Sequence, residues 1–325
     1  DTPSFTAGRF GGQAIAKQFQ NAFGEISKDL GGQSEVFFGM ANKIPGLTGS
    51  VSFYRLRDSS GTQILSVQFN SDGSVSVFAG GNSAVSAGGI ITTGGAWHYV
   101  ECHYIPKDAA GKGGVAEVRV DEIVVASIDG ASFTTTTGAD DDIQTFEFYD
   151  GGTNSGAYLY DDFYILNGSG SENNTYLGDV RITVLYPKAN GNINTMDPSD
   201  GVSPNYEMVD ETILDGDTTY VESSVIGTSE AYVNQTFSDI ALTPGIIYGV
   251  QVCNAGKKTG SGPIAWKNEA VIATIRYSDD VVHNAASGEY FVKSYIRDTD
   301  PSDDAAWTEA KVAAVGSALS IVNPV

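Results

Sequence analysis

The chain has 325 residues and carries 18 lysines and arginines against 40 aspartates and glutamates, a formal net charge of −22 at pH 7. Such a charge repels nucleic-acid phosphates and anionic membranes, and no run approaches the ~18 apolar residues of a transmembrane helix. We therefore expect no nucleic-acid partner and no membrane span. The length suits two domains, and 39 glycines, 16 tyrosines and 15 phenylalanines favour short strands joined by tight turns.

The first third of the chain predicts a series of short strands. Residues 34–40, 50–56, 63–69 and 74–78 are rich in β-branched and aromatic side chains and are separated by turn-forming residues. The NSDG turn at residues 70–73 is the strongest of these signals, because Asp-Gly tolerates the positive φ angles of a hairpin turn.

The stretch 96–130 predicts two hairpins. In WHYVECHYI, alternation divides the side chains between two faces, with Trp97, Tyr99, Glu101 and His103 on one and His98, Val100, Cys102 and Tyr104 on the other. Asp121 and Glu122 are expected to form a two-residue turn. In the strands that flank this turn, the residues expected to face inward are Val118, Val120, Ile123 and Val125.

Two further strands, QTFEFY and YLYDDFYIL, complete the pattern of an antiparallel sandwich. In the second, Leu159, Asp161, Phe163 and Ile165 are expected on one face. We place the first domain at residues 1–175 and a second all-β domain at 176–325, with 168–174 as the linker. Cys102 and Cys253 then fall in different domains, which predicts two separate buried thiols rather than a disulfide.

The second domain repeats the strand pattern and has one helix, expected at about residues 305–315 within DPSDDAAWTEAKVAAV. Ser302 or Asp303 is the expected N-cap, and Asp304 lies favourably at the positive end of the helix dipole.

The order of the motifs GRFGGQAI, WHYVECHY, EVRVDEIVV and LYDDFYIL resembles the laminin-G-like, concanavalin A-type jelly roll. Glu122 replaces the glycine that this family usually has in the turn. The later GDVRITVLYP, YEMVDE and DPSDDAAWTEAKV resemble the C-terminal half of tailed-bacteriophage structural proteins. The resemblance implies an all-β chain of two antiparallel β-sandwich domains, the first a concanavalin A-like jelly roll.

The same resemblance implies a non-enzymatic structural component of a tailed phage particle. Located in the virion, the chain would be a head decoration, head fibre, tail fibre or tail tip protein. Its expected partners are other capsid or tail proteins and further copies of itself. Head and tail locations are not distinguished by the sequence.

The alternative is a secreted bacterial carbohydrate-binding module or a laminarinase-like glycoside hydrolase. A retaining hydrolase needs two carboxylates ~5.5 Å apart, and the nearest candidates are Glu117, Asp121 and Glu122. Glu122 falls in the expected turn, and the three histidines have no recognisable catalytic partners. We therefore expect no enzymatic activity.

Calcium is the candidate cofactor. Jelly rolls that resemble this one often bind calcium at the rim of the sandwich, and Asp140, Asp141 and Asp142 precede a strand there. Clustered carboxylates are the hard oxygen ligands that calcium prefers. Solvated acidic loops are the favoured explanation of the same residues, because carboxylates are abundant throughout this chain.

Carbohydrate is the candidate ligand. Sugar binding combines exposed aromatic rings with hydrogen-bonding side chains, and Tyr158 and Tyr160 with Asp150 and Asn154 offer this combination. We expect weak adhesion to host surface glycans through these residues. The competing interpretation is that the domain only packs against other proteins of the particle.

Overall fold

The computed structural model divides the chain into two compact units, Asp1–Thr183 and Val184–Val325. The division follows Thr183, later than the residue 175 expected from the sequence. The residues described are 4–10, 13–18, 25–47, 49–107, 113–130, 142–149, 157–260, 265–279, 282–284, 288 and 290–322.

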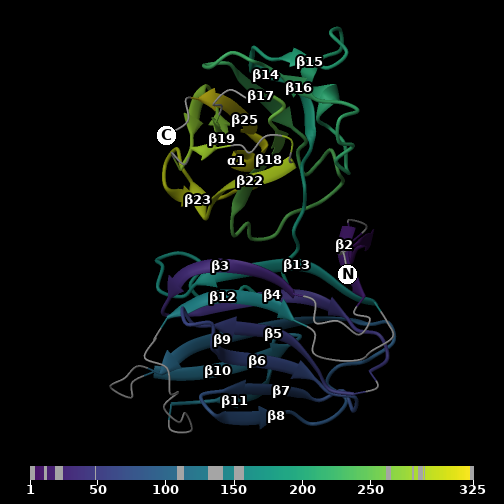
Figure 1. The fold of residues 1–325 in the computed structure, drawn as a ribbon, viewed down its shortest axis with the longest axis vertical. Coiled ribbons are helices and arrows are strands. Elements are labelled where there is room, and N and C mark those ends of the chain that lie inside the picture. Colours follow the sequence, from purple (N-terminus) through teal and green to yellow (C-terminus); the bar gives the residue numbers. More distant parts are fainter. Residues whose placement is uncertain are drawn as a thin grey trace. The chain divides into compact units, whose positions relative to one another are not determined.

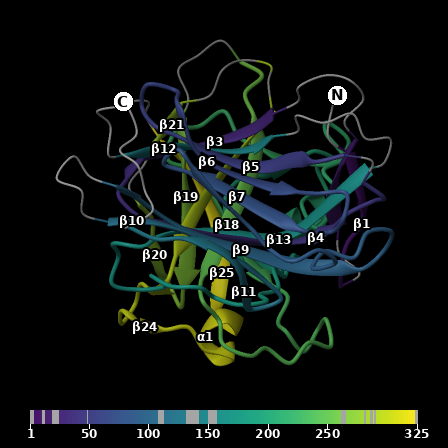
Figure 2. The ribbon, with the colours of Figure 1, turned by 90° about the horizontal axis from the view of Figure 1, so that it is seen from below.

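The N-terminal unit is an antiparallel β-sandwich, as expected, and Figures 1 and 2 show its two layers. Sheet A has the strand order β1-β2-β13-β4-β9-β10-β11, and sheet B has the order β3-β12-β5-β6-β7-β8. The strands of sheet A are β1 (Ser4–Ala7), β2 (Gln13–Gln18), β4 (Val36–Lys43), β9 (Trp97–Lys107), β10 (Gly113–Val120), β11 (Ile123–Ile128) and β13 (Ala157–Asn167). The strands of sheet B are β3 (Glu25–Gln33), β5 (Val51–Arg57), β6 (Gln63–Phe69), β7 (Val75–Ala79), β8 (Asn82–Val85) and β12 (Ile143–Tyr149).

The core of this unit lies between the two sheets and is lined by alternate residues of their strands. On β9 the inward residues are Val100, Cys102 and Tyr104, each at most 2% exposed. Phe38 of β4 packs edge-on against Phe146 of β12, so the sheets contact each other through aromatic rings. Burial of apolar side chains is worth roughly 1.5–3 kcal/mol each, so this layer supplies most of the stability.

The hairpin of β10 and β11 has the expected two-residue turn, but one residue that was expected to face the core is exposed. Asp121 and Glu122 have φ angles of 50° and 69°, as a two-residue type I′ turn requires. Ile123, expected inward, is 68% exposed. The pairing shifts register between Val118 and Arg119, and such a bulge changes which residues face the core.

The C-terminal unit is built around a sheet of the order β14-β17-β25-β19-β20, with β21 paired to β19. The strands of this sheet are β14 (Pro187–Asn194), β17 (Ser229–Asn234), β19 (Ala265–Ile272), β20 (Ile275–Tyr277), β21 (His283–Asn284) and β25 (Val315–Val322). The remaining strands form three pairs, β15 (Asp197–Pro198) with β16 (Val221–Glu222), β18 (Val250–Lys257) with β22 (Tyr290–Arg297), and β23 (Thr299–Asp300) with β24 (Ala305–Ala306).

Helices contribute little to the described part of this unit. A short 3₁₀ helix, η1, spans Asn205–Met208, and one α-helix, α1, spans Glu309–Ala313. The prediction of Ser302 or Asp303 as the N-cap is wrong. The N-cap is Thr308, whose side chain accepts a hydrogen bond from the Lys311 N–H at 3.3 Å. The residues before Thr308 include β24 instead of a helical turn.

Two further expectations concern the whole chain. None of the helices in the described segments is long and apolar enough to cross a bilayer. Both cysteines are free, with Cys102 buried and Cys253 exposed. The expectation of separate thiols is therefore confirmed, and the expectation that both are buried is wrong for Cys253.

Candidate functional site

Two of the three carboxylates weighed for hydrolysis, Glu117 on β10 and Asp121 in the turn that follows it, have structural partners. Glu117 accepts hydrogen bonds from Nε of Arg119 at 2.9 Å and from the Tyr176 hydroxyl at 3.1 Å. Asp121, in the β10–β11 turn, lies 2.8 Å from Nδ1 of His98. These contacts hold the hairpin and the segment that follows β13.

That segment, residues 176–182, crosses the outer face of sheet A, and we call it the strap. Its backbone N–H groups donate to side chains of the sheet, Leu177 to Tyr164 (3.3 Å), Gly178 to Glu101 (2.9 Å) and Ile182 to Asp162 (2.8 Å). Its apolar side chains pack on a second small cluster formed by Phe37, Ala41, Tyr99 and Tyr164. The polar residues of this face therefore anchor the strap.

Asp162 is a buried anchor of the strap whose carboxyl has a raised pKa. It is 5% exposed and its Oδ2 atom lies 3.7 Å from an Arg9 nitrogen. Burial raises the pKa of Asp162 to about 6, against the opposing effect of the hydrogen bond from Ile182. A carboxylate held in this way favours its protonated form as the pH falls.

The outer face of sheet B carries a different arrangement. Direct cross-strand pairs form one continuous row from β3 to β8, and residues paired in this way point to the same face. The row consists of Ser27, Glu147, Arg55, Ser66, Phe78 and Ser83. It runs across every strand of the sheet, perpendicular to the chain direction.

Glu147 and Arg55 lie at the centre of this row, and a second arginine, Arg57, binds Glu147 from beside the row. Arg55 donates to Glu147 through Nε at 2.9 Å, and a second guanidinium nitrogen lies 2.8 Å from the same oxygen. Arg57, two residues along β5, donates from Nε to the other Glu147 oxygen at 2.5 Å. Its Nη1 donates to the Gly61 carbonyl at 2.6 Å, which fixes the second guanidinium.

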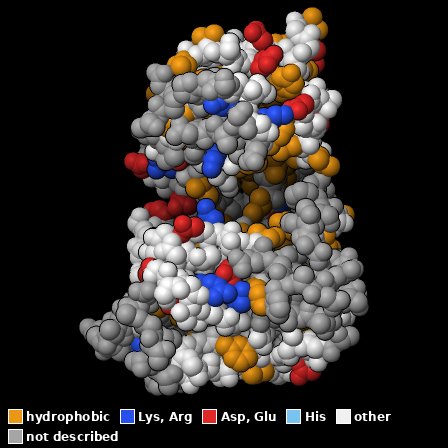
Figure 3. All heavy atoms as spheres, viewed as in Figure 1, with side chains coloured by type: hydrophobic (Ala, Val, Ile, Leu, Met, Phe, Trp, Pro, Cys, Tyr) orange, Lys and Arg blue, Asp and Glu red, His pale blue; other side chains and the backbone are white. Residues whose placement is uncertain are grey.

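The site is buried although it lies on an outer face. Arg55 is 8% and Glu147 is 3% exposed, and the Arg55 guanidinium carbon lies 3.1 Å from the centre of the Tyr149 ring. Two guanidiniums against one carboxylate leave a local net charge of +1 in a chain of net charge −22. Figure 3 shows basic side chains gathered in the middle of this face. The arrangement can attract an anionic group.

The aromatic residues predicted to bind carbohydrate lie elsewhere. Tyr158 and Tyr160 are 0% and 5% exposed and belong to the core between the sheets. Neither ring is available to stack on a sugar at the surface, which corrects that expectation. Asp150 and Asn154 lie outside the described residues.

The predicted calcium ligands are described only in part. Asp140 and Asp141 lie outside the described residues, and Asp142 directly precedes β12. The Asp142 carboxylate accepts a long hydrogen bond of 3.4 Å from the Ser59 N–H. No group of three or more potential metal ligands comes together within the described segments.

Sequence reasoning missed the arginine site, although a signal was present. Arg55 and Arg57 alternate in YRLR, and Glu147 and Tyr149 alternate in EFY, so each pair lies on one face of its strand. Charged residues at alternate positions of two aromatic-rich strands, in a chain with few basic residues, mark a polar site on a sheet. That pattern would have directed attention to β5 and β12.

Comparisons with known proteins give structural neighbours only. No protein-family model matches the chain, and no curated protein matches it in sequence. Among solved structures, an alginate lyase in complex with an alginate trisaccharide is 13% identical, with a TM-score of 0.39 over 48% of this chain and 82% of that one.

Two further neighbours are of the same kind. An endo-β-1,4-glucuronan lyase from the fungus Trichoderma reesei is 17% identical, with a TM-score of 0.38 over 50% of this chain and 86% of that one. An alginate lyase from a Chlorella virus is 12% identical, with a TM-score of 0.37 over 51% and 88%. At these identities the likeness shows the fold alone, a concanavalin A-like jelly roll.

These neighbours correct the functional expectation. The prediction of a non-enzymatic structural component of a phage particle is wrong, because the neighbours are polysaccharide lyases. The same neighbours are enzymes, which contradicts the expectation of no enzymatic activity.

Proposed function

We propose that the N-terminal unit binds a carboxylate-bearing polysaccharide on the outer face of sheet B and cleaves it. The observation that carries the proposal is the convergence of Arg55 and Arg57 on one carboxylate, Glu147, in the middle of a row of side chains that crosses the sheet.

The chemistry of the row favours an acidic sugar. A guanidinium presents five N–H donors in a planar fork that matches a carboxylate. Glu147 engages two nitrogens of Arg55 and one of Arg57, and it holds both groups in fixed positions. Because the chain as a whole is acidic, a polyanion gains attraction only where basic groups gather locally.

The same geometry supplies the elements of a β-elimination. In that reaction a base removes the proton from the carbon beside the sugar carboxylate, the neighbouring carbon–oxygen bond breaks, a carbon–carbon double bond forms, and the departing oxygen takes up a proton. Arg55 and Arg57 would neutralise the carboxylate and so stabilise the charge that develops there. Tyr149, packed against Arg55, is the candidate to take and return the proton.

The test is a cleavage assay with the full chain. We expect alginate or polyglucuronate to yield unsaturated products, detected by their ultraviolet absorbance, and laminarin, a neutral glucan, to yield none. Arg55→Ala should reduce the rate at least a hundredfold, on the scale of losing one charge-stabilising group. Arg119→Ala, at an arginine of sheet A paired with Glu117, is the matched control.

Two results would refute the proposal. Equal rates for the Arg55→Ala and Arg119→Ala variants would remove the arginine pair from the reaction. Release of reducing sugar from laminarin without unsaturated product would replace elimination by hydrolysis and acidic substrates by neutral ones.

A further inference from the structure

We infer that the same row contains a second binding element, a subsite at β6, β7 and β8 that stacks one sugar ring of the polysaccharide on Phe78. The inference deepens the proposed function and rests on it for the acidic nature of the polymer. It adds a place that recognises the ring of a sugar, separate from the place that recognises a carboxylate.

Phe78 is exposed where its neighbours in β7 are buried. Its side chain is 36% exposed, whereas Val77 and Ala79 are 0% and 4% exposed. Phe78 pairs with Ser66 on one side and with Ser83 on the other, so its ring stands on the outer face of sheet B. An aromatic ring on a sheet surface offers a flat apolar face to the C–H groups of a pyranose.

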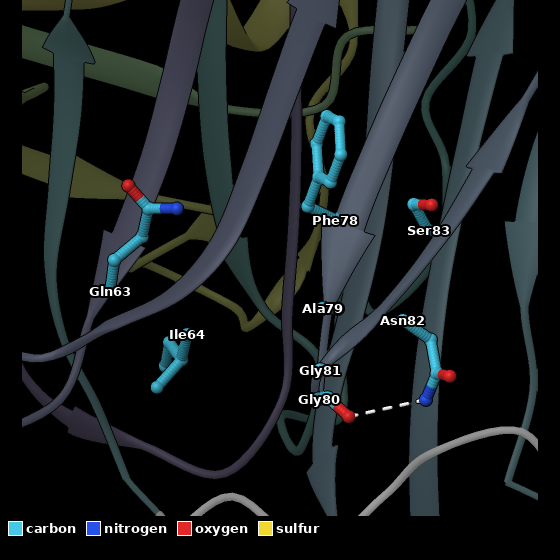
Figure 4. Close-up of a pocket in the computed structure, with 8 residues that line it drawn as sticks. All are labelled: Gln63, Ile64, Phe78, Ala79, Gly80, Gly81, Asn82 and Ser83. Atoms are coloured by element: carbon cyan, nitrogen blue, oxygen red, sulfur yellow. Dashed lines mark hydrogen bonds between the residues drawn. The ribbon is translucent and has the colours of Figure 1, made fainter.

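A hollow of about 350 Å³ adjoins this ring, at the lower end of the range for small-molecule sites. Figure 4 shows Phe78 between the amide of Gln63 on one side and the hydroxyl of Ser83 on the other, with Asn82 near the turn. Gly80 and Gly81 form this turn with φ angles of 55° and 77°. An apolar ring bordered by amides and hydroxyls is the combination that a sugar requires.

Ser66 links the two elements. It lies between Arg55 and Phe78 in the row, is 2% exposed, and its hydroxyl has no hydrogen-bond partner among the described residues. Ser66 is covered too deeply to contact a sugar, so it marks the position midway between the two elements without contributing a contact of its own. Because adjacent strands are about 4.8 Å apart, Arg55 and Phe78 are separated by about 10 Å, a span that an oligosaccharide can cover and a monosaccharide cannot.

The experiment measures binding by calorimetry with an alginate disaccharide and an alginate hexasaccharide. All variants of the full chain carry Tyr149→Phe, so that the ligands survive. Phe78→Ala should weaken hexasaccharide binding about tenfold and leave disaccharide binding unchanged, since the short ligand occupies only the arginine site. Phe78→Tyr keeps the ring and should keep the affinity.

Matched variants separate stacking from folding. Ile123→Ala truncates an apolar side chain that is 68% exposed on sheet A and should change neither affinity. Ser83→Glu places a negative charge at the rim of the hollow without removing Phe78, and it should also weaken the hexasaccharide. If Phe78→Ala unfolds the chain, Ser83→Glu and Phe78→Tyr still decide the question.

The outcomes distinguish this inference from the proposed function. If Arg55→Ala weakens binding and both Phe78→Ala and Ser83→Glu behave like Ile123→Ala, the subsite is overturned and the carboxylate site stands. If only the Phe78 and Ser83 variants weaken binding, the subsite stands and the carboxylate site is overturned. Absence of all binding overturns both, and self-association of the parent chain that is lost in Phe78→Ala would overturn the subsite by assigning the ring to a contact between copies.

Discussion

Glu147→Ala should destabilise the N-terminal unit more than any substitution of an exposed carboxylate. Glu147 is 3% exposed and pairs with Arg55 and Arg57, whose side chains are 10% and 28% exposed. Removing one partner of a buried ion pair costs about 3–5 kcal/mol, because the remaining charge stays desolvated. Water reaches Arg57 more easily than Arg55, so we expect a loss near 3 kcal/mol.

That loss can be measured as a shift of the unfolding midpoint. For a unit of this size, 1 kcal/mol corresponds to about 2–4 °C, so Glu147→Ala should lower the midpoint by about 6–12 °C. Hydrogen exchange of peptides from β5 and β12 should show the loss of protection there, while the C-terminal unit keeps its protection. Glu147→Gln keeps the side-chain volume and one acceptor oxygen. Its unfolding midpoint should therefore lie between those of the parent chain and Glu147→Ala.

The control is Glu172→Ala, at an exposed position in the segment after β13. If the two alanine variants shift the midpoint equally, Glu147 does not hold the arginines in a buried network. The assignment of this face as a preorganised anion site would then lose its physical basis.

Three further outcomes follow from buried or crowded groups. The raised pKa of Asp162, about 6 in the folded chain against 3.8, gives stability that is present below pH 4 and lost as the pH rises through 6. Asp162→Asn should therefore match the parent at pH 4 in thermal melts and exceed it at pH 7.5 by at most about 3 kcal/mol. Gly39→Ala should cost about 1–3 kcal/mol in urea unfolding, because its Cβ would lie 2.5 Å from a tyrosine ring, whereas Gly46→Ala, with no atom within 4 Å, should not. An alkylating reagent should label Cys253 and spare Cys102 in the folded chain, as mass spectrometry would show, because Cys102 is buried and its thiol pKa is raised by burial.

Strand faces could be predicted from the sequence wherever a strand is regular. Val100, Cys102 and Tyr104 face the core as the alternation of WHYVECHYI requires. The Asp121–Glu122 turn was also predictable, because its residue types and its position between two apolar runs agree.

Alternation did not predict the side-chain faces of strands that contain a bulge. In β13 the register shifts between Asp161 and Tyr164, and Asp162 has a φ of 53°. The bulge lets Tyr158 and Tyr160 face the core before it and Phe163 pack against the core after it. Counting alternate residues through the bulge placed Leu159 and Asp161 on the face of Phe163 and Ile165, whereas it is Tyr158 and Tyr160 that share the core with Phe163.

The arginine site depends on pairing between distant segments. Arg55 and Glu147 are separated by 92 residues, and they meet because β5 and β12 are neighbours in sheet B. Strand order of this kind is set by the packing of the whole sandwich. The sequence shows that each strand has a polar face, and only the fold shows that the two faces form one site.

The two outer faces of the sandwich also differ in what they can offer a ligand. On sheet A the buried carboxylates Glu101 and Asp162 already accept hydrogen bonds from the strap. On sheet B the charged groups Arg55, Arg57 and Glu147 bind one another and leave a local net charge of +1 in an acidic chain. Long-range repulsion therefore opposes an acidic polysaccharide until its carboxylates reach the arginines.

The salt dependence of the binding affinity should separate the long-range repulsion from the contacts with the arginines. Screening acts over about 8 Å at physiological ionic strength, so added salt weakens the repulsion from the distant carboxylates more than the contacts with Arg55 and Arg57. Affinity for an alginate hexasaccharide should hold or rise between low and physiological salt. A steep fall with salt, as in proteins that bind polyanions through exposed basic patches, would place the binding groups on the open surface and contradict a buried arginine pair.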